Sequence, residues 1–333
     1  MDLHQEFRRL FRDVDAQNVI AANMISLLPE TLVETQHQTA QAFSDKWNQF
    51  DYGSPEFEQL IRKQKQWYLD LYGFSDESAL AAYLQNCRLV LDAGAGMCYK
   101  AAWFAELSPS SLVVAADVSS SLQRAADYYK QINNLFFVRC DIAKMSFFEA
   151  GLFDYVSCDQ VIHHTADPFK TFQELVRVTG PGKELSVYVY RKKALPRELV
   201  DDYFREFSKT LDHRKLMEFS RQITELGRLL SSITAEIDFP DIPLLNIEGG
   251  RMAVQRFIYW NFLKCFWNEE LGYQNSLMTN YDWYAPSQAF RYSEQEFRNW
   301  IRVEQLEEVY FHKENACYSG RFLKPSKTDG FAG

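Results

Sequence analysis

The sequence predicts an α/β protein built around a parallel β-sheet, and three observations lead to this fold class. Short apolar runs recur through the middle of the chain, helical segments separate them, and a glycine turn follows the first run. Apolar runs of about four to eight residues that alternate with helices are typical of βαβ units, whose strands lie parallel. The five runs are Leu89–Ala93, Leu112–Ala116, Leu135–Arg139, Phe153–Ser157 and Glu184–Tyr190.

Periodicity divides the 333 residues into four stretches. Residues 1–86 are predicted to form a helical amino-terminal cover, and residues 87–194 the α/β core. Residues 195–290 show helical spacing without a strand pattern, so we expect a helical cap inserted into the core. Residues 291–325 return to the α/β pattern with a helix and two apolar runs spaced for a β-hairpin.

Composition and charge exclude several classes of protein. Lys and Arg number 36 against 45 Asp and Glu, which leaves a net charge of −9 and no basic cluster for nucleic acid. Apolar runs are too short to cross a bilayer, and the charged amino terminus does not resemble a signal peptide, so we expect a cytoplasmic protein without a membrane partner. The six cysteines are scattered, so reduced thiols are expected and no metal site is predicted.

The strongest local signal is the turn after the first predicted strand. Asp92 ends that strand, and Gly94 and Gly96 let the backbone bend tightly at the edge where open α/β sheets bind ligands. A dinucleotide fingerprint needs a third glycine at the position of Tyr99, so a pyrophosphate site is not supported. Asp117 ends the second strand, 21 residues after Gly96, where a carboxylate can accept hydrogen bonds from ribose hydroxyls.

With these residues the chain resembles the class I S-adenosylmethionine (SAM)-dependent methyltransferases of small-molecule pathways. Asp92, Gly94 and Gly96 match the family's first motif, whose turn touches the methionine part of SAM. Asp117 matches the acid that holds the ribose, and Asp141 matches the acidic position beside the adenine amino group. The resemblance covers residues 85–192 well and residues 293–323 weakly.

The resemblance also extends to the end of the fourth predicted strand. Phe153–Asp159 and the following His163-His164-x-x-Asp167-Pro168 look like the family's fourth motif, which adds Asp159 to the expected cofactor site. A third glycine that the first motif often has is Cys98 here. The family has a Rossmann-like sheet of seven strands, closed by a hairpin, so the resemblance implies this architecture for the present chain.

Candidates for catalysis and acceptor binding are less specific. His163 or His164 can serve as a base near the methyl group, because imidazole titrates near neutral pH, although packing is the simpler role for both. Aromatic residues concentrate in the predicted cap and most of them are expected to pack, yet the segment 281–286 is expected to be a loop that contributes to the acceptor pocket. The residues proposed to contact the acceptor are Trp47, Tyr281, Trp283 and Tyr284.

We therefore expect methyl transfer from SAM to an O, N or C atom of a small-molecule acceptor. Other SAM chemistry, such as cyclisation or carboxymethyl transfer, is an alternative. A catalytically silent partner subunit with the same fold is a second alternative, and an NAD-dependent reductase is a distant third because of Tyr99. The aromatic helices leave a homodimer open as an expectation.

Overall fold

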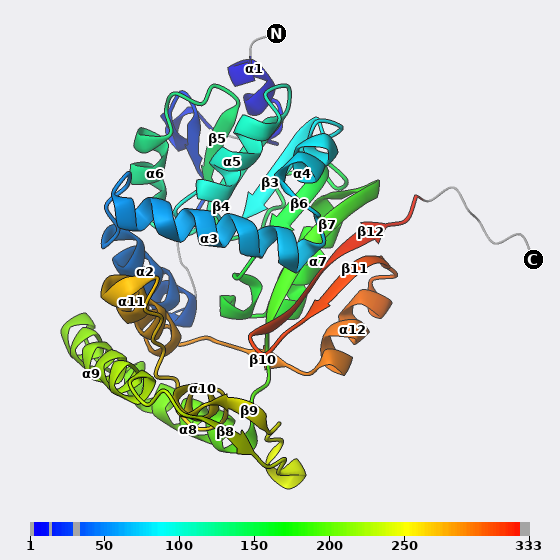
Figure 1. The fold of residues 1–333 in the computed structure, drawn as a ribbon. Helices are drawn as coiled ribbons and strands as arrows, with labels where there is room; N and C mark the ends of the chain where they lie inside the picture. The colour runs from blue at the N-terminus through cyan, green and yellow to red at the C-terminus, as the bar shows by residue number, and fades with distance from the viewer. Residues whose placement is uncertain (1–2, 13–14, 29–33, 327–333) are drawn as a thin grey trace, which may run out of the picture. The chain divides into compact units, whose positions relative to one another are not determined.

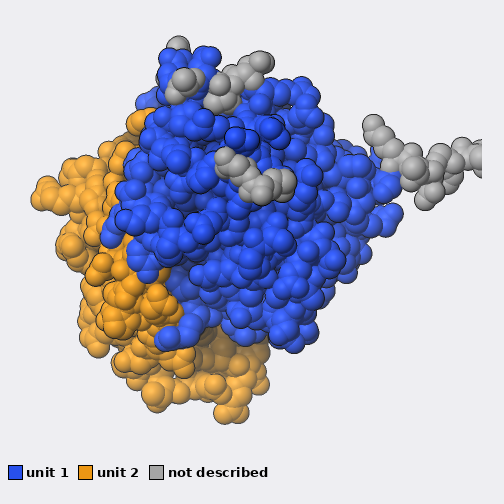
Figure 2. Space-filling view, turned by 90° about the horizontal axis from the view of Figure 1, so that it is seen from above, with its two compact units in different colours: residues 1–34, 61–190, 290–333 blue, residues 35–60, 191–289 orange. Residues whose placement is uncertain are grey.

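The computed structural model describes residues 3–12, 15–28 and 34–326 (Figure 1). The chain divides into two compact units (Figure 2). Unit 1 comprises residues 1–34, 61–190 and 290–333, and unit 2 comprises residues 35–60 and 191–289. The amino-terminal stretch thus contributes to both units, and we describe each unit by itself.

Unit 1 is built on a sheet of ten strands in the order β1-β2-β5-β4-β3-β6-β7-β12-β11, with β10 paired to β7. The strands β5-β4-β3-β6-β7 are parallel, and the carboxyl-terminal hairpin β11–β12 joins β7 antiparallel. These seven strands confirm the predicted architecture. Their bounds are β3 Leu89–Ala93, β4 Leu112–Asp117, β5 Leu135–Arg139, β6 Phe153–Cys158, β7 Thr179–Arg191, β11 Glu307–Lys313 and β12 Cys317–Lys324.

The central strands are buried along their whole length because helices cover both faces of the parallel sheet. Every residue of β3 and β4 is buried. Helix α5 packs on β3 and β4, α6 on β5, α7 on β6, and α12 on β12 (Figure 1). The helices and the remaining short elements of unit 1 are α1 Leu3–Arg8, η1 Ala16–Asn18, α4 Glu77–Leu84, α5 Tyr99–Leu107, α6 Leu122–Tyr128, η2 Ile162–His164, α7 Pro168–Val178, β10 Arg291–Tyr292 and α12 Glu294–Val303.

Two short strands, β1 (Val19–Ala21) and β2 (Met24–Ser26), lie in the stretch for which only helices are predicted. Strand β2 pairs parallel with β5, and β1 pairs antiparallel with β2. The helical prediction for this segment is therefore wrong, because a run of three residues is too short to show the alternation that identifies a strand. Pairing with the rest of the sheet stabilises these two strands, because β2 forms hydrogen bonds with the otherwise open edge of β5.

A long helix, α3 (Pro55–Tyr72), carries residues of both units. The Phe57 amide donates to the Ser54 hydroxyl at 3.2 Å, as an N-cap does, and Gly73 ends the helix with a left-handed φ of 67°. Serine and glycine are typical residues for these two helix ends. In unit 1 this helix contributes side chains to the carboxyl edge of β6, described below.

Unit 2 is mostly helical, with α2 preceding α3 in the sequence. Its further elements are α2 Glu34–Asn48, α8 Leu195–Ser208, α9 His213–Ser231, β8 Glu236–Phe239, η3 Pro243–Leu245, β9 Gly250–Ala253, α10 Val254–Asn261 and α11 Gly272–Tyr284. The antiparallel pair β8–β9 contradicts the expectation of a stretch without strands, because a two-stranded hairpin is held by its own local pairing. The segment 281–284 is also not a loop, because it forms the last turn of α11. The aromatic side chains of this turn, Tyr281, Trp283 and Tyr284, are buried.

Two further findings concern the described part of the chain. None of its helices combines the length and the apolar character needed to cross a membrane. All six cysteines fall within it, and each is a buried free thiol. Burial raises the pKa of the thiols of Cys98, Cys140 and Cys158, which keeps them protonated at neutral pH.

Candidate functional site

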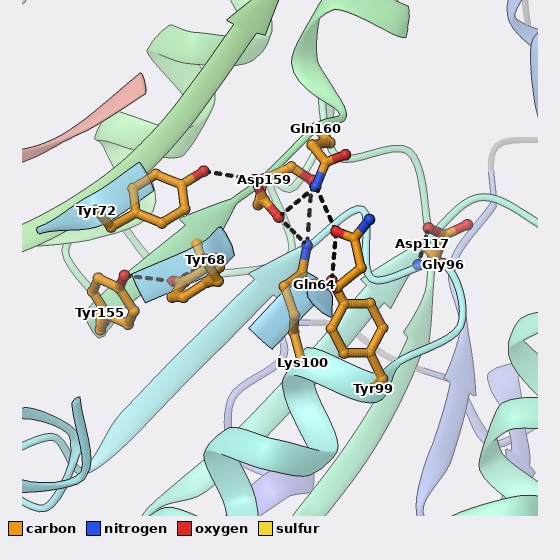
Figure 3. A network of polar contacts seen from close by, with 11 residues as sticks. Gln64, Tyr68, Tyr72, Gly96, Tyr99, Lys100, Asp117, Tyr155, Asp159 and Gln160 are labelled. Atoms are coloured by element: carbon orange, nitrogen blue, oxygen red, sulfur yellow. Dashed lines mark hydrogen bonds and ion pairs between the residues drawn. The ribbon is translucent and has the colours of Figure 1, made fainter. Parts of the chain in front are cut away.

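The glycine turn between β3 and α5 is held by the neighbouring strand β4. The amides of Gly94 and Ala95 donate to the carbonyl oxygen of Ala116 at 2.7 and 3.0 Å. One carboxylate oxygen of Asp117 accepts from the Gly96 amide at 2.8 Å (Figure 3). The other carboxylate oxygen accepts from the Ser119 amide at 2.7 Å. Asp117 therefore shapes the turn, and each carboxylate oxygen retains a lone pair for a further donor.

Steric fit explains why glycine is needed at position 94. Its φ is +79°, and a Cβ added there would lie 2.3 Å from Cγ1 of Val161. The same turn places Cys98 at a left-handed φ of 59°, which is unfavourable for a residue with a side chain. Cys98 stands where the family often has a third glycine, and the backbone conformation shows why glycine suits that position.

A buried network lies at the carboxyl end of β6, beside the turn (Figure 3). The Lys100 ammonium contacts Asp159 Oδ2 at 2.9 Å, with both side chains buried. The Tyr72 hydroxyl donates to Asp159 Oδ1 at 2.9 Å, and the Gln160 side-chain amide donates to Asp159 Oδ2 at 3.2 Å. Burial alone would lower the pKa of Lys100, but Asp159 and Asp92 raise it above its usual value, so the lysine is charged.

Helix α3 supplies part of this network from one face. The Gln64 side-chain oxygen accepts from Gln160 at 3.2 Å, and the Tyr68 hydroxyl contacts the Tyr155 hydroxyl at 2.7 Å. Positions 64, 68 and 72 follow one another at helical i, i+4 spacing, so their side chains share a face. The helical cover predicted for residues 1–86 agrees with this face of α3, whereas its partners at β6 could not be read from the sequence.

Asp92 lies at the end of β3 with its carboxylate fully buried. Among the described residues, none makes a hydrogen bond of good geometry with either side-chain oxygen, and the Ala101 amide lowers the pKa of the carboxyl only weakly. Burial raises the pKa of Asp92 to about 6 from 3.8, the attraction of Lys100 opposes this shift, and the charges of Asp159 and Asp117 add to it. The turn thus gathers three carboxylates against one ammonium, a surrounding that favours a cationic ligand over a pyrophosphate.

The remaining predicted residues of unit 1 occupy neighbouring strand ends. Asp141 follows β5, and its carboxylate accepts from the Ala143 amide at 3.0 Å. His163 and His164 lie in η2 after β6, and both are buried. The His163 ring packs on Tyr190 with ring centres 3.7 Å apart. The catalytic role of the two histidines and the adenine contact of Asp141 stay predictions.

The four aromatic residues predicted for the acceptor all belong to unit 2. Tyr281, Trp283 and Tyr284 are each 2% exposed, and Trp47 is half-buried. The Tyr281 hydroxyl contacts Nδ1 of His213 at 2.9 Å, and the Tyr284 hydroxyl donates to the carbonyl oxygen of Lys264 at 2.8 Å. Both tyrosine hydroxyls thus have internal partners, and acceptor contact by these residues stays a prediction.

A model of the methyltransferase-domain family matches residues 91–187, which include the turn, the ends of β4, β5 and β6, and both histidines. Residues 91–187 are a class I methyltransferase domain. The cofactor of such a domain is SAM. The matched residues include the glycine turn, Asp117, Asp141 and the segment from Phe153 to Pro168.

Relatives of the methyltransferase domain are distant. An uncharacterised protein of Synechococcus sp. is 30% identical over 105 residues, which are 30% of this chain, and the chain spans only 25% of that protein's length. A solved 1,6-didemethyltoxoflavin-N1-methyltransferase of Burkholderia thailandensis, with bound 1,6-didemethyltoxoflavin and S-adenosylhomocysteine, is 14% identical, with 95% of this chain and 99% of that chain covered and a TM-score of 0.42.

A second solved structure, PKMT2 of Rickettsia typhi in complex with AdoHcy, is 17% identical, with 72% of this chain and 45% of that chain covered and a TM-score of 0.44. Both TM-scores are below 0.5, so the assignment of the methyltransferase domain rests on the match of the family model to residues 91–187.

The residues of the methyltransferase domain fit SAM in two respects. The buried carboxylate of Asp92, which accepts no hydrogen bond of good geometry from the described residues, suits the positively charged methionine end of the cofactor. Asp117 is 8% exposed and keeps lone pairs for ribose hydroxyls. Its two backbone hydrogen bonds hold the carboxylate in place before any ligand arrives.

The buried Asp92 makes the stability of the methyltransferase domain depend on pH. Because its folded pKa of about 6 exceeds the ordinary 3.8, the folded chain binds this proton more tightly than the unfolded chain does. The carboxyl group is therefore tolerated below pH 4, and its ionisation destabilises the fold as pH rises through 6. Asp92→Asn should gain about 2–3 kcal/mol relative to the parent between pH 4 and pH 7.

Urea unfolding of Asp92→Asn and of the parent at several pH values tests this expectation. The exposed Asp127 offers a matched control, since Asp127→Asn should leave the pH dependence of stability unchanged. A difference between Asp92→Asn and the parent that stays constant from pH 4 to pH 7 would contradict the assigned pKa shift.

Proposed function

We propose that this chain transfers a methyl group from SAM to an O, N or C atom of a small-molecule acceptor. The observation that carries the proposal is the family-model match over residues 91–187 together with the Asp117-held glycine turn at the carboxyl edge of the sheet. The acidic net charge of −9 disfavours nucleic acid as the acceptor. The aromatic residues of unit 2 support an amphipathic small molecule.

The chemistry asks little of the protein beyond placement. SAM carries an activated sulfonium, so bound SAM supplies both the methyl group and a neutral leaving group. The chain's own residues have to hold the cofactor, orient the acceptor atom in line and exclude water. We assign the ribose to Asp117, the methionine end to the turn at Gly94 and Gly96 with Asp92, and the adenine edge to Asp141.

Asp159 takes a different part in the proposal. Its carboxylate already contacts Lys100, Tyr72 and Gln160, so we assign it to stabilising the buried network at the carboxyl end of β6. His163 and His164 are our candidates for accepting the acceptor's proton, where the acceptor atom carries one. Unit 2, with Trp47, Tyr281, Trp283 and Tyr284, is our candidate for acceptor recognition.

The acceptor can be sought directly. The purified chain is incubated with methyl-labelled SAM and a protein-free extract of small metabolites, and labelled products are identified by mass spectrometry. The proposal expects a labelled product heavier than its precursor by one CH2 group. An added carboxymethyl group or a cyclised product would favour other SAM chemistry. If label is transferred only in a parallel incubation with the protein fraction of the extract, a protein acceptor would replace the small molecule.

Replacing Asp117 tests the cofactor assignment. Asp117→Ala should weaken SAM binding by about 1–3 kcal/mol, because two ribose hydroxyls lose their acceptor and the Gly96 amide loses its partner. Calorimetric titration with SAM measures the effect at a temperature where both proteins are folded. Asp127→Ala, at an exposed site, is the control and should bind SAM like the parent; equal affinity for Asp117→Ala would refute the assignment.

A further inference from the structure

Unit 2 contains a buried cluster of cationic side chains around one indole ring. The Lys264 ammonium lies 4.5 Å from the centre of the Trp283 ring, and the guanidinium carbons of Arg197 and Arg205 lie 5.1 and 6.0 Å from it. Lys264 is 6% exposed, Arg197 1% and Trp283 2%. Three cations therefore share one indole ring, and two of them, Lys264 and Arg197, are buried.

The neighbouring acids, Asp201 and Asp282, each form an ion pair with another cation. Arg197 pairs with Asp201 at 2.7 Å within α8. Lys46, from α2, pairs with Asp282, from α11, at 2.5 Å. The ammonium of Lys264 makes no hydrogen bond and no ion pair with any residue in the described ranges. The ammonium of Lys264 therefore has no ion-pair partner among these carboxylates.

Arg205 brings a further positive charge to the Trp283 ring. Its guanidinium donates to the carbonyl oxygens of Trp283 and Pro286 at 3.0 and 2.7 Å, so these contacts fix its position against neutral groups. The indole ring attracts all three cations through its quadrupole, but such attraction is worth only about 1–2 kcal/mol. A buried ammonium without an ion pair costs more than that, and an anion in direct contact with it would lower the cost.

We propose that unit 2 contains a binding site for a small oxyanion, in which the Lys264 ammonium pairs with the carboxylate or phosphate group of a ligand beside Trp283. The ammonium of Lys264, which makes no ion pair, suits one oxygen of such a group. Burial lowers the pKa of Lys264 to about 8 from 10.5; Asp282 and Asp201 oppose this shift, whereas Arg197 and Lys46 add to it. Anion binding and proton uptake by Lys264 are therefore coupled.

The site has a consequence for the acceptor. If unit 2 recognises the acceptor, as proposed above, then the acceptor carries a carboxylate or phosphate group; this statement rests on the proposed function. The oxyanion site itself does not, since it follows from the contacts of Lys264 alone. Anion binding without any methyl transfer would leave the site standing and remove only the proposed function.

Lysine labelled with 13C at Cε gives a direct test in the full chain. The Lys264 resonance is assigned by its loss in Lys264→Met and is followed through a pH titration with acetate, with inorganic phosphate, or with uncharged acetamide, at constant ionic strength. The proposal expects acetate or phosphate to move the titration of Lys264 to higher pH by about one unit, a tenfold preference of the anion for the charged lysine. Acetamide should leave it unchanged.

Variants add a second readout. The apparent affinity for the effective anion, measured from thermal shifts, should be at least tenfold lower in Lys264→Met than in the parent. Lys264→Arg keeps the charge and should retain the affinity. Lys209, which is partly exposed and paired with Glu206, is the control, and Lys209→Met should respond like the parent. A Lys264 titration that neither acetate nor phosphate moves would overturn the proposal, as would an equal thermal shift in Lys264→Met.

Discussion

Replacing Lys100 with methionine will lower the free energy of unfolding by about 3–5 kcal/mol, because the change leaves Asp159 as a buried carboxylate without its counter-ion. The two side chains are 6% and 1% exposed, so water does not screen the loss. Tyr72 and Gln160 still donate to Asp159, which places the expected loss toward the lower end of this range. Urea denaturation followed by circular dichroism measures it.

The matched control for Lys100→Met is Lys170→Met. Lys170 also pairs with an aspartate, Asp167, at 3.2 Å, but the two side chains are 76% and 47% exposed. Its loss should change stability by less than about 0.5 kcal/mol. The double variant Lys100→Met with Asp159→Asn should recover part of the lost stability, because no unpaired charge then remains at position 159; an equal loss in Lys100→Met and Lys170→Met would show that the pair is not buried in solution.

The second large effect is expected at the glycine turn. Gly94→Ala combines a left-handed backbone with a Cβ 2.3 Å from Cγ1 of Val161, whose branched side chain has little freedom to move away. We expect a loss of about 2–4 kcal/mol in unfolding free energy, from overpacking and backbone strain together. Affinity for SAM should fall at least tenfold in calorimetric titration, because the change displaces the turn that we propose to bind the methionine end.

Gly272 separates the two contributions. Its φ of +75° is close to that of Gly94, but nothing lies within 4 Å of an added Cβ. Gly272→Ala therefore carries the backbone strain alone, about 1 kcal/mol, and the difference between the two variants measures the collision with Val161. If Gly94→Ala were no less stable than Gly272→Ala, the tight packing of the turn would be wrong.

Much of unit 1 could be predicted because its strands are continuous apolar runs. The runs around Val90, Val114 and Phe137 are buried on both faces of the sheet, and that is the pattern that a parallel sheet imposes on sequence. The glycine turn and Asp117 could be predicted equally well, since both depend on residues close to a strand end. Elements fixed by tertiary pairing, such as β2 against β5, leave no comparable trace in a three-residue run.

The site shows the same division. Asp117 was predicted as a ribose ligand, and its additional part in holding Gly96 is a contact between residues far apart in sequence. Lys100 was missed because a lysine in a helix is usually solvated, and its burial depends on Asp159 and on a cover from α3. One signal was present: Lys100 is the only charged residue in the run from Met97 to Ala105.

The buried thiols of unit 1 bear on selectivity toward the methyl group. A thiolate attacks a sulfonium readily, whereas a protonated thiol is a poor nucleophile. Cys98 lies in the glycine turn itself, with its sulfur donating to the carbonyl oxygen of Gly96 at 3.6 Å, and Cys140 and Cys158 follow or end neighbouring strands. Because burial keeps all three in the thiol form, we expect none of them to compete with an external acceptor for the methyl group of SAM.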